Sequence, residues 1–352
     1  MFLLLVYWFV GTLFSFLTIL TMHSTTWFMN TLQKLKTPSL STPLLIMQLI
    51  ILSPLLLLGI VLDRFRPVPV PLNLDSYKKP FVKSSSDIKV MSYNVQCCLS
   101  AASRYAPTVT CSIIVEQAPD IVLLQELTDR GMDGNWIGTT AHTTTEEDET
   151  IDKVNQIELL VSILEKQGLH YEGVYHGPHE LSESLAGREG TYGIGILVLK
   201  KHRILKRDTL TYTRLHGREV RGAVSVDVEF SDEKACKFIC THLQHDPTGY
   251  EQFLQALELI KFAGGGNVVI GGDMNCGSSA AAVRTLGARY GEKNADGGTF
   301  PFNRWLTIKL DHLFCGGPDF GRTRGDKILK GDWSDHYPVL SFGGHAIENN
   351  RS

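Results

Sequence analysis

Polar side chains suited to acid–base or metal chemistry follow apolar segments in this 352-residue sequence. The clearest case is VVIGGDMNC, residues 268–276, in which Asp273 and Asn275 come after three aliphatic residues. The continuous apolar run is typical of a strand buried on both faces. Side chains of an extended chain alternate, so Asp273 and Asn275 are expected to point the same way from the strand end. An Asx turn is the plainer explanation for an isolated D-x-N.

Further polar residues close apolar segments in the same manner. They are Asn94, Glu126, His242, Asp311, Asp335 and His336. Each has an ordinary structural explanation when taken alone, such as a turn, a helix cap or an ion pair. Together they are more informative, because a sheet brings the ends of its strands to one edge. Carboxylate and amide oxygens suit a hard cation and imidazoles transfer protons, so this combination is typical of metal-assisted catalysis.

Alternating strand-like and helix-like segments from residue 87 onward would position these side chains. Apolar segments predict strands over 88–93, 120–127, 192–199, 220–230, 236–243, 267–275, 310–315 and 338–342, and helical patterns cover 103–118, 151–167 and 248–263. Strands separated by both helices and hairpins predict an α/β sandwich of two mixed sheets with helices outside. The long polar stretch 131–150 is expected to form a lid beside the site, since long irregular loops are usually functional or disordered.

Two uncharged apolar segments, over residues 2–22 and 43–62, precede this region. Each has about the 20 residues that a helix needs to span a bilayer core. We therefore expect a transmembrane hairpin over 1–66, a Pro- and Ser-rich linker over 67–86, a catalytic domain over 87–343 and a tail over 344–352. Five Lys or Arg residues follow the second span and two lie between the spans. This bias predicts an integral membrane protein with its catalytic domain on the cytoplasmic side.

The charge distribution bears on the substrate class. The first 86 residues hold seven of the 34 Lys and Arg and two of the 37 Asp and Glu. Residues 87–352 therefore hold 27 basic against 35 acidic residues, a balance of −8. Such a balance disfavours a nucleic-acid binder, whose affinity depends largely on neutralising phosphates. The basic run KKHRILKR, residues 200–207, is either a solvated turn or a patch for anionic headgroups.

The motifs SYNVQ, LLQEL, THLQHD, GGDMN, LDHLF and SDHYPV occur in this order between residues 92 and 339. Over 87–343 the sequence resembles the endonuclease/exonuclease/phosphatase superfamily, which includes pancreatic-type deoxyribonucleases, apurinic endonucleases, inositol-polyphosphate 5-phosphatases and neutral sphingomyelinases. The resemblance implies a four-layer α/β sandwich of two mixed sheets flanked by helices, here preceded by the two-helix membrane hairpin. It also implies Mg²⁺-dependent hydrolysis of phosphoesters, with Mn²⁺ as the expected substitute.

The resemblance further implies a role for each strand-end residue. Glu126 matches the main Mg²⁺ ligand, and Asn94 and Asp311 would help to hold the metal or its waters. Asp273 would deprotonate the attacking water, and Asn275 would donate to the phosphoryl oxygens. The remaining implied roles belong to His336, which would face the phosphate with Asp311 or Asp335 fixing its tautomer, and to His242, which would contact the phosphate.

Three functions are compatible with these features. The first is a membrane-tethered phosphodiesterase that acts on phospholipid headgroups, similar to neutral sphingomyelinases and bound to the bilayer through residues 1–66. The second is a nuclease of the same superfamily, which the acidic balance disfavours. The third, a membrane scaffold without catalytic activity, is the least expected, because every matching metal and catalytic position is filled.

Overall fold

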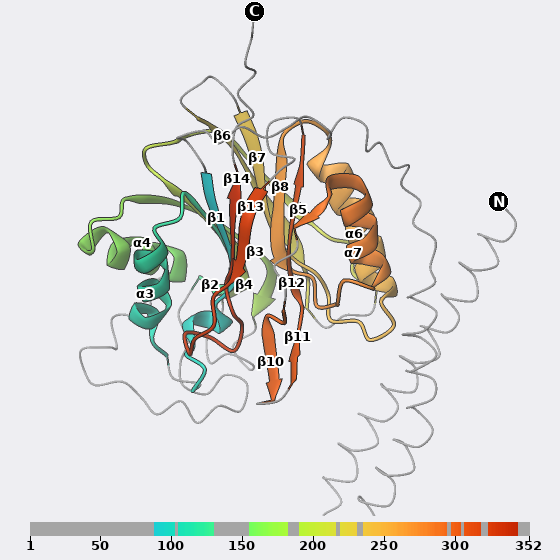
Figure 1. The fold of residues 1–352 in the computed structure, drawn as a ribbon, viewed down its shortest axis with the longest axis horizontal. Coiled ribbons are helices and arrows are strands. Elements are labelled where there is room, and N and C mark those ends of the chain that lie inside the picture. Colours follow the sequence, from blue (N-terminus) through green and yellow to red (C-terminus); the bar gives the residue numbers. More distant parts are fainter. Residues whose placement is uncertain are drawn as a thin grey trace, which may run out of the picture.

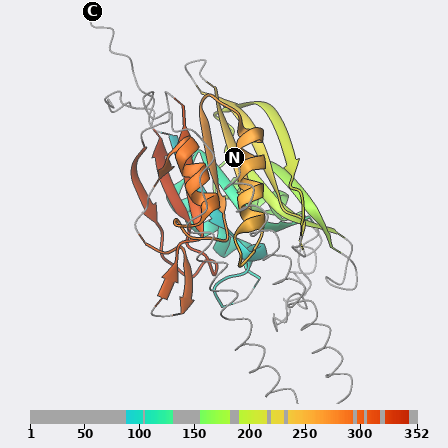
Figure 2. The same ribbon diagram turned by 90° about the vertical axis from the view of Figure 1, so that its right-hand side faces the viewer.

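Two six-stranded mixed sheets pack face to face in this computed structural model, with helices on their outer faces (Figure 1, Figure 2). The structure describes residues 88–102, 105–129, 155–181, 190–215, 219–230, 235–293, 297–303, 306–317 and 323–343.

The first sheet has the strand order β13-β14-β1-β2-β4-β3. Its strands are β1 (Ile88–Asn94), β2 (Ile121–Thr128), β3 (Tyr171–Leu181), β4 (Gly190–Leu199), β13 (Thr323–Ile328) and β14 (Val339–Gly343). Strands β1 and β2 are parallel and the other neighbours are antiparallel. Helices α3 (Pro107–Gln117) and α4 (Gln156–Lys166) cover its outer face, where Ile114 and Leu160 pack against Met91 and Leu124.

The second sheet has the strand order β5-β6-β7-β8-β12-β9. Its strands are β5 (Arg203–Thr211), β6 (Gly222–Glu229), β7 (Ala235–His242), β8 (Val268–Asp273), β9 (Glu292–Lys293) and β12 (Asp311–Gly316). Only the pair β7 and β8 is parallel among these described strands. Helices α6 (Tyr250–Ala263) and α7 (Ala281–Tyr290) cover the outer face, and the pair β10 (Phe300–Asn303) and β11 (Leu306–Ile308) extends beyond the sheets (Figure 1).

The central core lies between the sheets. Side chains such as Leu123 and Ile196 from the first sheet meet Phe238 and Leu313 from the second, and all four are buried. Gly271 of β8 allows this close approach, because a Cβ atom there would lie 2.6 Å from side-chain carbons of both Leu123 and Leu313. This close packing fixes the two sheets relative to each other, and with them the positions of the residues at the strand ends.

The fold class predicted from the sequence requires a correction. The expected hairpin over 1–66, the linker over 67–86, the lid over 131–150 and the tail over 344–352 lie outside the described residues. Among the residues that are described, none of the helices is both long and apolar enough to cross a bilayer. The longest of them, α6, has 14 residues, short of the roughly 20 that a span needs. The fold is a mixed α/β fold with two mixed sheets and few helices, so the two-helix membrane hairpin and the integral-membrane localisation derived from it are not supported.

Candidate active site

Three predicted residues form one row across the second sheet. Strand β8 lies between β7 and β12, and its register places Asp273 opposite His242 on one side and Asp311 on the other. All three residues are at least 98 % buried. They share the inner face with Val269 and Leu313, because side chains along a strand alternate between its faces. Strand pairing thus joins residues that are up to 69 positions apart in the sequence.

Asp273 combines a turn with a position facing the site. Its Oδ1 accepts the backbone N–H of Asn275 over 2.8 Å, which is an Asx turn, and Asn275 has a left-handed φ of 51°. Its Oδ2 lies 3.5 Å from Nε2 of His242 and 3.8 Å from Nε2 of His336. The turn and the functional role that the D-x-N motif suggested therefore coexist, because each uses a different carboxylate oxygen.

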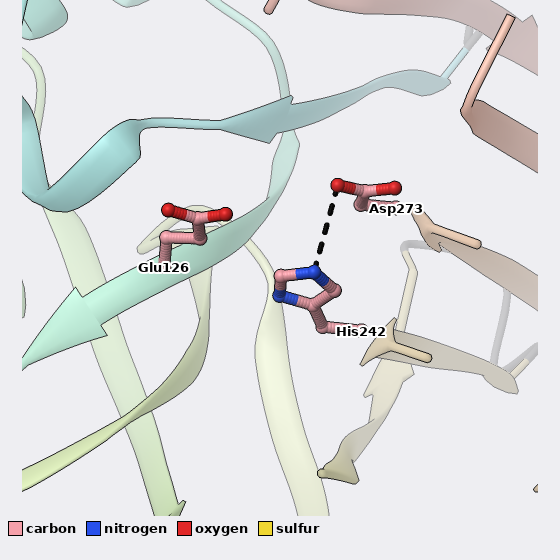
Figure 3. A group of neighbouring side chains, drawn as sticks. All are labelled: Glu126, His242 and Asp273. Carbon is pink, nitrogen blue, oxygen red and sulfur yellow. Dashed lines mark ion pairs between the residues drawn. The ribbon is translucent and has the colours of Figure 1, made fainter. Parts of the chain in front are cut away.

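Glu126 reaches the site through a β-bulge in β2. The pairing with β4 shifts register between Gln125 and Leu127, and Glu126 has a φ of 61°. Leu124 and Leu127 both pack in the outer cluster, so the extra residue interrupts the normal alternation. Figure 3 shows the carboxylate of Glu126 facing His242 and Asp273 from the opposite sheet. One ligand atom from each of these three residues lies within 4.8 Å of the others.

Asn94 links the two sheets at the end of β1. Its Nδ2 donates to Glu126 over 2.9 Å and to Asp273 over 3.1 Å, while its Oδ1 accepts from the backbone of Gln96. The next turn, η2 (Gln96–Cys98), consists of three left-handed residues, none of which is glycine. Each such residue costs about 1–2 kcal/mol, so the surrounding structure must hold this turn in place.

His336 and Asp311 form a buried pair. Nδ1 of His336 lies 2.8 Å from Oδ2 of Asp311, and the ring of Phe300 packs against the imidazole at a centroid distance of 4.9 Å. Burial disfavours the charged ring, but the carboxylates of Asp311, Asp273 and Asp335 outweigh it and raise the pKa of His336 to about 10. His336 is therefore an imidazolium near neutral pH, and Asp311 rather than Asp335 is the residue that orients it.

His242 has a partner that the sequence did not suggest. Arg221, at the start of β6, places its NH1 2.8 Å from Nδ1 of His242 and is 92 % buried. Because a guanidinium can only donate, Nδ1 must accept, and the neutral ring carries its hydrogen on Nε2. Burial, Arg221 and His336 all lower the pKa of His242 well below its ordinary value. Nδ2 of Asn275 lies 2.9 Å from Nε2, but both are donors in this tautomer, so the acceptor near Nε2–H is Oδ2 of Asp273, at 3.5 Å.

Arg221 also contacts Glu219, at 2.6 Å, and lies over the ring of Tyr192, at 5.7 Å. Burial lowers its pKa, but Tyr192, Glu219 and Glu126 together raise it above the ordinary value, so the guanidinium stays charged. A signal for Arg221 exists in the sequence, because it is a cation directly before the apolar alternation of 222–229. It could not be assigned to the site without knowing that β6 pairs with β7.

Two observations indicate that this site fits a divalent cation. Burial and the charge of Asp335 raise the pKa of Glu126 to about 7, although the Asn94 hydrogen bond opposes the rise. Oδ1 of Asp311 is buried and has no hydrogen-bond partner within the described part of the chain. Glu126 lies in an excess of negative charge, and Asp311 keeps one oxygen unpaired although its other oxygen contacts His336. Oxygen donors are the ligands that Mg²⁺ prefers. Asn94 turns its amide nitrogen toward Glu126, so it orients that carboxylate rather than offering an oxygen.

All eight predicted site residues thus gather at one edge of the two sheets. Seven of them are joined by the contacts above. The hydroxyl of Ser334 lies 2.9 Å from the carbonyl oxygen of Asn94 and 3.1 Å from Oδ1 of Asp335, and its one hydrogen can be donated to either of them. The basic run 200–207 is not a turn alone, because it continues into the edge strand β5. Its cations are largely paired, through Lys201–Asp120, Arg203–Glu229, Lys206–Asp208 and Arg207–Glu172.

Comparisons with known proteins agree with this fold. The model of the Endonuclease/Exonuclease/phosphatase family matches residues 91–336. One similar solved structure is an endonuclease/exonuclease/phosphatase from Bacteroides vulgatus, which is 17 % identical; the match covers 74 % of this chain and 100 % of that chain, with a TM-score of 0.56. Another, from Beutenbergia cavernae, is 16 % identical; the match covers 74 % of this chain and 72 % of that chain, also with a TM-score of 0.56. The human nocturnin catalytic domain with a bound sulfate anion is also similar, with 16 % identity, 76 % of this chain and 98 % of that chain covered, and a TM-score of 0.50. No curated protein sequence matches the chain. The chain belongs to the Endonuclease/Exonuclease/phosphatase family and is a phosphoester hydrolase.

Proposed function

We propose that this protein is a Mg²⁺-dependent phosphodiesterase whose substrate is the headgroup of a phospholipid. The observation that carries the reaction type is the position of Oδ2 of Asp273. This atom lies within 3.8 Å of Asn94, His242 and His336, which come from different strands and loops. A carboxylate surrounded by amide and imidazole groups is suited to accept a proton from water beside an anionic substrate.

The proposed metal site consists of oxygen donors. Glu126 would hold the ion, and the unpartnered Oδ1 of Asp311 and the carboxylate of Asp335 would hold its water molecules, since these three carboxylates do not group within 4.8 Å of one another. When bound, Mg²⁺ supplies positive charge to the phosphoryl oxygens, and Mn²⁺ is the expected substitute. Asn94 keeps Glu126 in place through its 2.9 Å hydrogen bond.

The protein groups divide the remaining work by charge and protonation state. Asp273 would take the proton of the attacking water, and the neutral Nε2–H of His242 would donate to the phosphoryl group. The imidazolium of His336 would stabilise the negative charge that develops there, with Asp311 holding its ring. Asn275, fixed by its contact with the carbonyl of Leu243, would help to orient the substrate.

The charge balance of the site favours a diester over a monoester. Five carboxylates belong to the site, namely Glu126, Glu219, Asp273, Asp311 and Asp335, and its cations are Arg221 and His336. With all five ionised, as when Mg²⁺ has displaced the proton of Glu126, the protein groups carry three net negative charges, and the bound Mg²⁺ reduces these to one. A phosphodiester carries a single negative charge, whereas a phosphomonoester carries nearly two near neutral pH, so the site repels the monoester more strongly.

The preference for a lipid over a nucleic acid rests on charge elsewhere. Residues 87–352 have a balance of −8. The paired cations along β5 offer little free positive charge to a polyanionic strand. A lipid headgroup presents one phosphodiester at a time and needs no such surface.

The test is a substrate panel with the full-length chain and Mg²⁺. We expect hydrolysis of bis(p-nitrophenyl) phosphate to exceed that of p-nitrophenyl phosphate and to stop with EDTA. Asp273→Asn should lose roughly a hundredfold or more, as expected for a general base. Activity that survives chelation, or a monoester preference, would refute the proposed reaction.

Sphingomyelin and phosphatidylcholine vesicles and plasmid DNA then decide the substrate class. Release of phosphorylated headgroups without cleavage of DNA supports the lipid assignment. Efficient DNA cleavage without lipid hydrolysis would replace it with the nuclease assignment and leave the metal-dependent diester chemistry in place.

A further inference from the structure

Gln156 is a buried side chain whose two polar ends hold separate parts of the chain. It is the first residue of α4 and has no exposed surface. Its Nε2 donates to the carbonyl oxygen of Cys97 over 2.8 Å, and its Oε1 accepts from the backbone N–H of Thr128 over 2.9 Å. A side-chain amide is well suited to this arrangement, because it offers a donor and an acceptor about two ångströms apart.

Both segments that Gln156 contacts have unusual backbone conformations and lie next to proposed metal-site residues. Cys97 is the middle residue of the left-handed turn η2, which follows Asn94. Thr128 lies two residues after Glu126, whose left-handed conformation forms the bulge of β2. Such conformations persist only where neighbouring structure determines them, and Gln156 bonds to the backbone of both segments.

The distance between these two segments sets the geometry of the site. The Nδ2 of Asn94 donates to Glu126 over 2.9 Å, and among the described strands the register gives Glu126 itself no partner in β4. The backbone bond from Val95 to Gln125 keeps the strands together before the bulge. Gln156 connects them after it, through Cys97 and Thr128.

We propose that Gln156 is a positioning residue for the metal site, because it fixes the turn after Asn94 relative to the bulge that presents Glu126. This inference rests on the proposed function, since it assigns the effect of Gln156 to metal binding. Substitution of a side chain that orients a metal ligand without binding the metal typically lowers metal affinity or activity by roughly 10–100-fold.

The test uses two variants of Gln156 and a matched control in the full-length chain. Gln156→Met keeps a similar shape and removes both hydrogen bonds. Gln156→Glu keeps an acceptor for Thr128 but offers no donor to Cys97, and it carries the test where the Met variant fails to fold. The control is Asn155→Ala, which removes the N-cap bond to Ile157 at the start of the same helix and touches neither segment. The readouts are the Mg²⁺ and Mn²⁺ dissociation constants of the metal-free protein by calorimetry, and the melting temperature.

We expect Gln156→Met to weaken Mg²⁺ and Mn²⁺ binding by roughly 10–100-fold and Gln156→Glu by a smaller factor. Asn155→Ala should bind Mg²⁺ and Mn²⁺ with the wild-type affinity, even if its melting temperature falls as much as that of the Gln156 variants. The Mg²⁺ concentration for half-maximal diester hydrolysis should rise in parallel with the dissociation constant. Wild-type affinity in both Gln156 variants would overturn the inference alone. A wild-type protein that binds neither cation would refute the proposed function and this inference with it.

Discussion

Binding of Mg²⁺ to the metal-free protein should release a proton from Glu126. Burial and Asp335 raise the pKa of this carboxyl to about 7, from an ordinary value of 4.5. The neutral form therefore stabilises the metal-free fold, and this contribution is complete below pH 4.5 and is lost as the pH rises through about 7. Mg²⁺ reverses the preference, because the ligand must be deprotonated. The ionised fraction of Glu126 rises about tenfold between pH 6 and pH 8, and the apparent affinity for Mg²⁺ should rise with it.

Calorimetry in buffers of different ionisation enthalpy measures the released protons directly. We expect about 0.9 proton per Mg²⁺ at pH 6 and about 0.1 at pH 8, which follow from one group that titrates near 7. Glu165→Gln, a change at an exposed carboxylate of α4, should leave both values unchanged. Binding without proton release at pH 6, or with an affinity independent of pH, would show that Glu126 is ionised before the metal arrives and would refute the reasoning.

Three further results are expected. Asp311→Asn should lower kcat by roughly a hundredfold and move the alkaline limb of the pH–rate profile to lower pH, because the carboxylates that raise the pKa of His336 to about 10 include Asp311. An unchanged limb would contradict this pairing. Gly271→Ala should cost about 1–3 kcal/mol in urea unfolding, since the new Cβ meets leucine side chains of both sheets at 2.6 Å, and an unchanged midpoint would refute that contact. Asp120 is buried, but its bonds to His202, Lys201 and the backbone outweigh burial and lower its pKa from 3.8 to about 2, so Asp120→Asn should cost about 2 kcal/mol at pH 7. The loss of unfolding free energy in Asp120→Asn should become smaller as the pH falls from 4 toward 2. An equal loss at pH 4 and pH 2 would contradict the lowered pKa of Asp120.

The strand ends could be predicted from the sequence because their signals are local. The apolar run before Asp273 indicates a buried strand, and β8 covers Val268–Asp273. The expected strands at 120–127 and 236–243 correspond to β2 and β7, so Glu126 and His242 were expected near the strand ends where they lie. That these ends meet at one edge follows from sheet geometry, although the sequence alone does not give the register.

Other features depend on contacts between distant segments. The left-handed turn Gln96–Cys98 and the bulge at Glu126 contain no glycine that would reveal them, because tertiary hydrogen bonds hold their conformation. Arg221 joins the site only through the pairing of β6 with β7. The charged run that begins β5 predicts a turn from the sequence, because it lacks the apolar residues of a buried strand. It is instead an exposed edge strand, where charged side chains are common. The predicted membrane hairpin has no support among the described residues, where no helix is long and apolar enough to cross a bilayer.

The return of the chain to its first sheet has a consequence for synthesis. Strand β14 pairs with β1, far away in the sequence, as well as with its sequence neighbour β13, and His336 lies just before β14. A nascent chain that has made the strands up to β12 therefore lacks both an edge of the first sheet and the imidazolium of the site. Hydrolysis should begin only after β14 has left the ribosome. Translation products that end before β14 should therefore be inactive.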